Sequence, residues 1–207
     1  MDDYLSNLLE KLKTKKDANT YLEVGDCYCF GRHTAKNEQN AMYYYQEAAN
    51  MGSARGELRV GMLYYYGAGV RKDSKRASKY FKSAADKGEL DAMYLLGQMY
   101  FDGEIGWGKG KAFEWWMKAA KRNHAKSQMK VGYCYIVDVG EEADPKKATY
   151  WLACAYLQSS KDKQASNSAK EYLDWLISHR RVSSDYVQSV IARVRAEHPE
   201  YLHKTNI

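Results

Sequence analysis

The chain has 207 residues, with 32 Lys and Arg against 26 Asp and Glu, so its formal net charge is +6. Residues 160–207 carry eight of the basic and six of the acidic residues, and no arginine-rich run or nucleic-acid motif is present. We interpret the excess as a mild basic surface spread along the chain, which disfavours a nucleic-acid partner. No apolar run is long enough to cross a bilayer, and no secretory signal follows the acidic start Met1-Asp2-Asp3, so we expect a cytoplasmic protein without a membrane span.

The first expected element is a helix over residues 3–13, capped by Asp2 or Asp3, with Leu5, Leu8 and Leu12 on one side. These leucines lie 36 residues before Ala41, Tyr44 and Ala48, which belong to the second helix of a repeated unit. Residues 1–16 are therefore predicted to be a half-repeat that covers one end of a stack.

The first helix of each unit is marked by a glycine, and the four glycines are spaced by 36, 36 and 35 residues: Gly25, Gly61, Gly97 and Gly132. A tyrosine follows three residues later: Tyr28, Tyr64, Tyr100 and Tyr135. An apolar residue precedes each glycine: Val24, Val60, Leu96 and Val131. A small residue stands five before: Thr20, Gly56, Ala92 and Ser127. These offsets lie close to one face of a helix, where small residues permit close packing.

The second helix of each unit carries alanines seven residues apart, which are Ala41 and Ala48, Ala77 and Ala84, Ala112 and Ala119, and Ala148 and Ala155. Three residues after the first alanine comes an aromatic residue: Tyr44, Tyr80, Trp115 and Trp151. We place this aromatic on the packed face, so that in the triplets Tyr43-Tyr44-Tyr45 and Tyr64-Tyr65-Tyr66 the core members are Tyr44 and Tyr64.

The turns agree with this division. The corner residues tolerate positive φ: Gly31, Gly67, Gly103 and Asp138. The second helices are expected to begin after Asn37, Asp73, Gly108 and Asp144, with Pro145 in the first helical position. The units end on Gly52, Gly88 and Asn123.

The pattern resembles the Sel-one-like repeat, a relative of the tetratricopeptide repeat with a G-x-G-V corner that stands here as Gly67-Ala68-Gly69-Val70. The resemblance covers roughly residues 17–156 and implies an all-α, right-handed α-α superhelix that presents surfaces to other proteins. The units are then 17–52, 53–88, 89–123 and 124–158. Residues 159–207 are left for C-terminal capping helices and a tail.

The C-terminal helices have their own apolar faces. A helix near residues 163–179 places on one side Ala165, Ala169, Tyr172, Leu173, Leu176 and Ile177. A second helix, capped by Ser183 or Ser184, carries Val187, Val190, Ile191 and Val194. Pro199 is expected to end it, with a frayed tail beyond Glu200.

No catalytic residue, cofactor or metal site is predicted. Cys27 and Cys29 point about 200° apart on a helix and cannot share a metal ion. Cys27 and Cys134 read as small core residues, and a Cys134–Cys154 disulfide stays open. Cysteine-rich relatives are linked with penicillin binding, and two Ser-x-x-Lys runs occur, Ser127 to Lys130 and Ser160 to Lys163. Their partner motifs are missing, so a β-lactam-hydrolysing enzyme is only the alternative hypothesis. The five histidines form no recognisable site, and we expect capping or solvent contact for His124.

Binding residues are sought where the first helices differ between units, on a stripe six and two residues before and one and five after the glycine. Its partner-binding candidates are Asp26, Phe30, Arg55, Arg59, Met62, Tyr66, Leu95, Gln98, Asp102, Lys126, Lys130 and Tyr133. By resemblance, first helices line the concave side, which makes the stripe a candidate groove for a protein or peptide. Alternatively, its alternating charges simply pair between adjacent helices.

The function we infer is that of a non-catalytic scaffold or adaptor from a bacterium, and an immunity or inhibitor protein acting against a toxin belongs to that class. The sequence does not specify the partner or the oligomeric state. Tyr66 is the leading single candidate for a contact residue.

Overall fold

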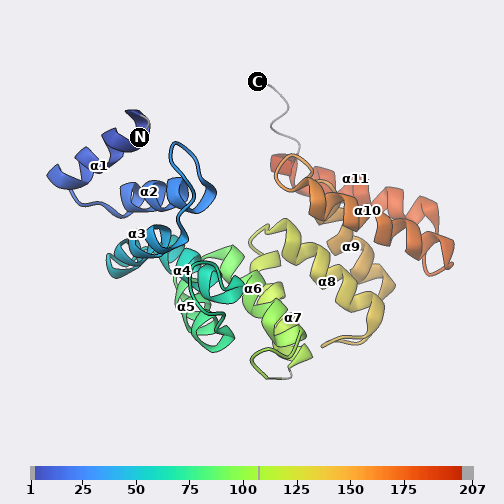
Figure 1. Ribbon diagram of the computed structural model, residues 1–207. Helices are drawn as coiled ribbons and strands as arrows, with labels where there is room; N and C mark the ends of the chain where they lie inside the picture. Colours follow the sequence, from blue (N-terminus) through green and yellow to red (C-terminus); the bar gives the residue numbers. More distant parts are fainter. Residues whose placement is uncertain (1–2, 107, 202–207) are drawn as a thin grey trace. The chain divides into compact units, whose positions relative to one another are not determined.

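The computed structural model describes residues 3–106 and 108–201, which form eleven α-helices, a C-terminal 3₁₀ turn and no strand (Figure 1). Consecutive helices pack against one another from α1 to α5 and from α7 to α10, as in an all-α solenoid, which confirms the predicted fold class. Asp2, Trp107 of the third corner and the tail residues 202–207 were part of our sequence predictions and lie outside the described residues.

The chain divides into two compact units, and unit 1 spans Met1–Leu96. It contains α1 (Asp3–Thr14), α2 (Ala18–Phe30), α3 (Glu38–Asn50), α4 (Ala54–Tyr66), α5 (Ser74–Asp86) and the beginning of α6 (Leu90–Phe101). Each of the first four helices packs on the next. The predicted N-terminal helix is confirmed as α1, whose Leu5 and Leu8 are buried.

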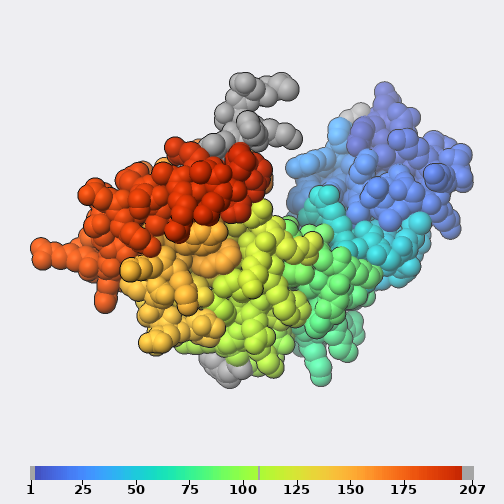
Figure 2. Space-filling view, turned by 180° about the vertical axis from the view of Figure 1, so that it is seen from behind, coloured from blue at the N-terminus to red at the C-terminus, as the bar shows by residue number. Residues whose placement is uncertain are grey.

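Unit 2 spans Gly97–Ile207 and contains the rest of α6 and the remaining helices. These are α7 (Lys109–Ala120), α8 (Ala125–Val137), α9 (Pro145–Tyr156), α10 (Lys163–Ser178) and α11 (Ser184–Glu197), followed by the 3₁₀ turn η1 (Pro199–Tyr201). Both α10 and α11 pack on α9. In Figure 2, the red surface of these C-terminal helices lies against the orange surface that precedes them in the sequence. The predicted apolar face of α11 is buried: Val187, Val190, Ile191 and Val194.

Most of the predicted repeat positions form the core. Both alanines of every second helix are fully buried. The apolar residue before each glycine is also buried, as is the residue two after it, which is Cys27, Leu63, Met99 or Cys134. The alanines allow the two helices of a repeat to approach closely, because a larger side chain there would hold the backbones apart.

The predicted packing of the second-helix aromatics is wrong by one residue. The fully buried position lies four residues after the alanine, where the chain has Tyr45, Phe81, Trp116 and Leu152. A Cβ built on each marker glycine would lie 2.4–2.6 Å from this side chain, so the glycine provides the space that the side chain fills. Tyr44 and Tyr80 are only half-buried, and they stack on Tyr28 and Tyr64 at ring-centroid distances of 5.6 and 5.9 Å.

The predicted caps and corners are confirmed. The side chains of Asn37, Asp73 and Asp144 accept hydrogen bonds from backbone N–H groups in the first turn of their helices. Asn123 and Asp138 adopt the left-handed conformation, with φ of 63° and 57°, at positions where the other repeats have glycine. Asparagine and aspartate tolerate this region better than other residues with side chains.

The expectation of a frayed tail beyond Glu200 is wrong for Tyr201, which is 3% exposed. Its hydroxyl donates to Asn123 Oδ1 at 2.6 Å and accepts from Gln128 Nε2 at 3.3 Å. Gln128 is buried and also accepts at 2.5 Å from the Nε2 of Gln158, a buried residue just after α9. A buried amide needs hydrogen-bond partners, and Tyr201 supplies an acceptor to the Gln128 amide of α8. The sequence analysis did not predict this contact.

Candidate protein-binding surface

In unit 1, the centre of the candidate stripe is Tyr45 of α3. Its ring packs against Gly25, and its hydroxyl reaches the first helix α2. The Tyr45 hydroxyl donates a 2.6 Å hydrogen bond to Asp26 Oδ1. Burial first, and then this bond to a carboxylate, raise the pKa of Tyr45, so that it stays a protonated donor. Arg59 of α4 approaches the same carboxylate oxygen, with Nη2 3.3 Å from Oδ1. One carboxylate thus joins α2, α3 and α4.

The Arg59 guanidinium is also enclosed by aromatic rings. Its Cζ lies 5.6 Å from the ring centroid of Phe30 and 6.0 Å from that of Tyr45. Its Nε is buried and has no hydrogen-bond partner in the described residues. The Arg59 side chain is only 19% exposed, whereas Phe30 is half-exposed. Because a partly desolvated cation over a ring is worth up to about 2 kcal/mol, Arg59 holds Phe30 against the stripe.

The other candidates of unit 1 differ in exposure. Arg55 is exposed, and no carboxylate of the described residues lies within ion-pair distance of it. Tyr66 is 64% exposed, the most exposed of the large apolar and aromatic side chains described. Its ring meets that of Tyr65 edge to face. Met62 and Leu95 are half-buried. Arg55 and Tyr66 therefore have the most surface to offer a partner.

Unit 2 contains a second cation over aromatic rings at the equivalent repeat position. Lys130 stands two residues before Gly132, as Arg59 stands two before Gly61. Its Nζ lies 5.4 Å from the ring centroid of Trp116 and 5.9 Å from that of Phe101. Burial lowers the pKa of the Lys130 ammonium, and the charge of Asp102 offsets part of that effect.

Asp102 also accepts a 2.8 Å hydrogen bond from Gln98 Nε2. An acid, a cation and aromatic rings thus recur together in unit 2.

The last two candidates, Lys126 and Tyr133, are covered by the C-terminal segment. Tyr133 meets the ring of Tyr172 from α10 at a centroid distance of 5.4 Å. Lys126 Nζ lies 3.7 Å from the carboxylate of Asp162, the residue that caps α10. Since α10 already occupies this part of the stripe, Lys126 and Tyr133 have less free surface for a partner.

The sequence analysis missed the ring beneath each cation, Tyr45 in the first repeat and Trp116 in the third. Residue size could not identify it, because the residues three and four after the alanine are both large in all four repeats. Choosing the aromatic at three residues instead placed Tyr45 outside the core. In the first three repeats, the residues three and four after the alanine are both aromatic, so only the packing shows which of the two is buried.

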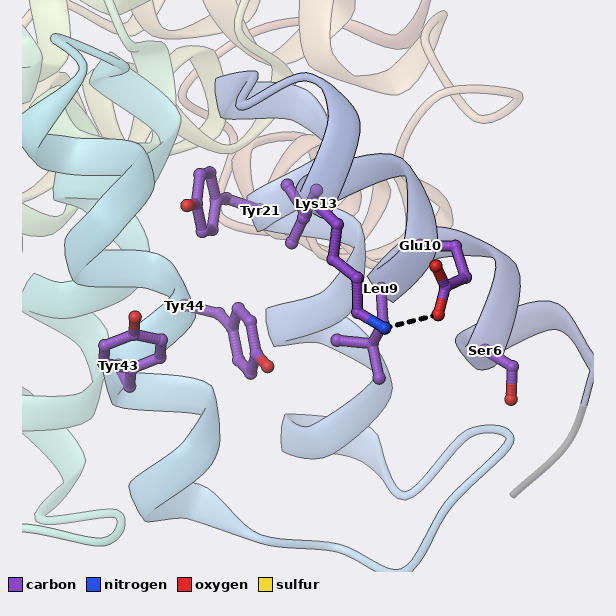
Figure 3. Close-up of a pocket in the computed structure, with 8 residues that line it drawn as sticks. Ser6, Leu9, Glu10, Lys13, Tyr21, Tyr43 and Tyr44 are labelled. Carbon is purple, nitrogen blue, oxygen red and sulfur yellow. Dashed lines mark hydrogen bonds and ion pairs between the residues drawn. The ribbon is translucent and has the colours of Figure 1, made fainter.

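Away from the stripe, a hollow of about 430 Å³ opens where α1, α2 and α3 meet (Figure 3). Tyr21, Tyr43 and Tyr44 line it from α2 and α3, and Leu9 and Lys13 line it from α1. Lys13 is held in a 2.6 Å ion pair with Glu10 on the same helix. The hollow explains why Tyr44 is only half-buried, because its side chain lines this open space.

The structure gives little support for chemistry at the cysteines. All four are free thiols, and Cys134 and Cys154 are not bridged. Burial raises the pKa of both thiols to about 12, which suppresses the reactive thiolate. Across the part of the chain that is described, no three His, Cys, Asp or Glu residues are placed to hold a metal ion.

Ser127, the serine of one Ser-x-x-Lys run, is fully buried. His124 Nδ1 lies 2.7 Å from Ser127 Oγ, a pair that the sequence analysis missed. His124 is the residue that caps α8, as expected, but its side chain bonds to Ser127 and not to a backbone N–H. Because a nucleophile must reach its substrate, the burial of Ser127 makes this pair a structural contact of the α8 start.

None of the described helices is long and apolar enough to span a membrane.

Comparison with known proteins agrees with this architecture. The model of the Sel1 repeat matches residues 18–53, 54–89, 90–124 and 125–160. A Sel1 repeat protein from Oxalobacter formigenes is 25% identical with a TM-score of 0.68, over 81% of this chain and 48% of that one. The protective antigen c5321 of uropathogenic Escherichia coli is 19% identical with a TM-score of 0.69, over 99% and 53%.

The immunity protein Pa5087 of Pseudomonas aeruginosa is 15% identical with a TM-score of 0.55, over 98% of this chain and 79% of that one. No curated protein sequence matches. The chain spans about half the length of the Oxalobacter and E. coli proteins. Sel1 repeats are typical of protein-interaction scaffolds, which are ordinarily non-catalytic. With four matched repeats over more than half of its length, the chain belongs to the Sel1 repeat family.

Proposed function

We propose that the chain is a non-catalytic scaffold that binds a protein or peptide through the first-helix stripe of unit 1. The observation that supports this most is the exposure of Tyr66, Phe30 and Arg55 beside a fixed core of Asp26 and Arg59. Exposed aromatic and arginine side chains on a rigid support are the residues that dominate binding energy at protein interfaces. The support is rigid because α2, α3 and α4 share the Asp26 carboxylate.

An immunity or inhibitor role is one form of this proposal. The fold shared with Pa5087 is compatible with it, and the identity of 15% carries no more than the fold. A toxin partner would then be expected to cover Tyr66 and Arg55. The enzyme alternative is disfavoured by the burial of Ser127, while Ser160 lies exposed in the turn after α9.

The test is an affinity pull-down from the source organism with the full chain as bait. Arg55→Glu/Tyr66→Ala is the test variant, because neither residue takes part in the Asp26–Arg59 pair. Lys163→Glu/Tyr43→Ala is the matched control, with one charge reversal and one tyrosine truncation at exposed sites outside the stripe.

We expect a partner that is captured by wild type and control and lost from the stripe variant at unchanged melting temperature. A partner held equally by all three proteins would refute the stripe as the binding surface. If no protein is captured by wild type, the scaffold function itself fails, and chromogenic β-lactam hydrolysis with Ser160→Ala as control becomes the next assay.

A further inference from the structure

The second repeat carries an amount of charge that sets it apart from the others. Residues 53–88 contain nine Lys or Arg and three Asp or Glu, so their net charge of +6 equals that of the whole chain. Residues 17–52 are net negative, and residues 89–123 and 124–158 are each balanced. The earlier interpretation of a basic excess spread along the chain is therefore wrong.

Most of this charge lies on α5 and on the corner before it. Residues 71–87 contain seven Lys or Arg against two Asp, and all seven basic residues are exposed. Lys75, Lys79 and Lys82 follow one another at i, i+4 and i+7, which places them along one face of α5 over about 10 Å. The opposite face of α5 is buried through Ala77, Phe81, Ala84 and Ala85.

Part of this positive charge is not neutralised within the protein. Arg76 pairs with Asp73, and Lys82 pairs with Asp86, at the two ends of the helix. Within the described residues, no carboxylate lies within ion-pair distance of Lys75, Lys79 or Arg71. The middle of the face thus keeps charges that a partner could neutralise.

Packing does not require lysine at these positions, as the repeats themselves show. The residues of α3 that match Lys75, Lys79 and Lys82 are Gln39, Tyr43 and Gln46, and α7 has Gly110, Glu114 and Met117. These helices bury the same alanine positions without the three lysines. The basic face is therefore a property of this repeat and not of the fold.

We propose that the outer face of α5, defined by Lys75, Lys79 and Lys82, is a docking surface for an acidic protein segment. This inference rests on the proposed function in that the partner is a protein, and it adds the chemistry of that partner. Carboxylates spaced along one face of a helix, or on a strand of similar length, would match the three lysines. Complementary charges of this kind raise the association rate and select the partner.

One feature favours an acidic protein over a nucleic acid. The neighbouring rings of Tyr64 and Tyr80 stack on one another and are half-buried, so they offer no free platform to bases.

The experiment is a fluorescence-anisotropy titration of the full chain with a labelled helical peptide that carries glutamates at i, i+4 and i+7. A peptide with glutamine at the same positions and a short DNA duplex are the comparison probes. The test variant is Lys75→Gln/Lys79→Gln/Lys82→Gln. The matched control is Lys146→Gln/Lys163→Gln/Lys170→Gln, which removes the same charge from exposed sites in unit 2.

We expect the glutamate peptide to bind wild type and control alike, and the α5 variant roughly tenfold more weakly, with affinity that falls as salt is added. Equal binding to the α5 variant and the control, or no binding of the glutamate peptide, would overturn the inference. Tighter, α5-dependent binding of the DNA duplex would overturn the partner class. The pull-down tests the scaffold function separately, because capture of a partner by the full chain does not depend on whether the glutamate peptide binds α5.

Discussion

The ring of Tyr45 rests directly on Gly25, at the point where α3 crosses α2. A Cβ on Gly25 would lie 2.5 Å from Cδ1 and Cε1 of that ring, well inside any permitted contact. The same relationship joins Gly61 to Phe81, Gly97 to Trp116 and Gly132 to Leu152. In unit 1, it also determines where the hydroxyl of Tyr45 emerges, and so where Asp26 and Arg59 meet.

Replacing Gly25 with alanine is expected to destabilise the protein by about 1–3 kcal/mol, because the fully buried ring has no free space into which to move. The measurement is urea unfolding followed by circular dichroism. Gly110→Ala is the control, since a Cβ there meets nothing within 4 Å and α7 should gain up to about 1 kcal/mol. Equal effects of the two substitutions would contradict the close approach of Tyr45.

The Asp26–Arg59 pair should be measurable by a double-mutant cycle with Asp26→Ala and Arg59→Ala. We expect a coupling free energy of about 1 kcal/mol, since the pair is half-buried and shares Tyr45 as a further donor. Tyr45→Phe in the same background removes only the hydroxyl. A coupling energy indistinguishable from zero would show that the pair contributes nothing to stability, and Arg59 would then be free to serve a partner.

The cysteines should react in an order set by burial. With pKa values of about 12, Cys134 and Cys154 have roughly one thiolate in ten thousand molecules at pH 8, so native labelling by iodoacetamide should be slow at both. Raising the pH increases the thiolate fraction, and denaturation removes the burial that raises the pKa. Cys29, the only cysteine that is not buried, should be labelled first. Mass spectrometry of the labelled peptides gives the order, and early labelling of Cys134 would be inconsistent with this packing.

Tyr201 should stabilise unit 2 although it lies near the end of the chain. Tyr201→Phe removes a donor to Asn123 and an acceptor from Gln128, and we expect a loss of about 1 kcal/mol. Tyr201→Ala also removes a buried ring and should cost about 3 kcal/mol. All five tryptophans of the chain lie between residues 107 and 175, so their fluorescence reports the unfolding of unit 2.

The control for this prediction is Tyr66→Phe, which alters an exposed hydroxyl in unit 1. Its tryptophan-detected unfolding midpoint should match that of wild type. If Tyr201→Ala also unfolds at the wild-type midpoint, the turn after α11 is not anchored to α8.

The sequence alone determined the helix boundaries and the repeat. Glycine, asparagine and aspartate at the corners and caps act through local backbone geometry, which is readable residue by residue, and Asn37, Asp73 and Pro145 stand where they were expected. The alanines of the second helices were equally readable, because only small residues recur there. The stripe on the first helices follows from the same register, although its role as a binding surface stays a prediction.

Only the tertiary structure decided which of two neighbouring aromatic residues enters the core. Tyr44 and Tyr45 are chemically identical and lie about 100° apart on α3, so neither propensity nor hydrophobicity separates them, whereas the space above Gly25 accepts one ring. The pairing of Arg59 with Asp26, and the return of Tyr201 to Gln128 and Asn123, likewise join residues far apart in the chain. Such contacts depend on how complete helices pack against one another, and the local sequence around each residue does not show which distant residue it will contact.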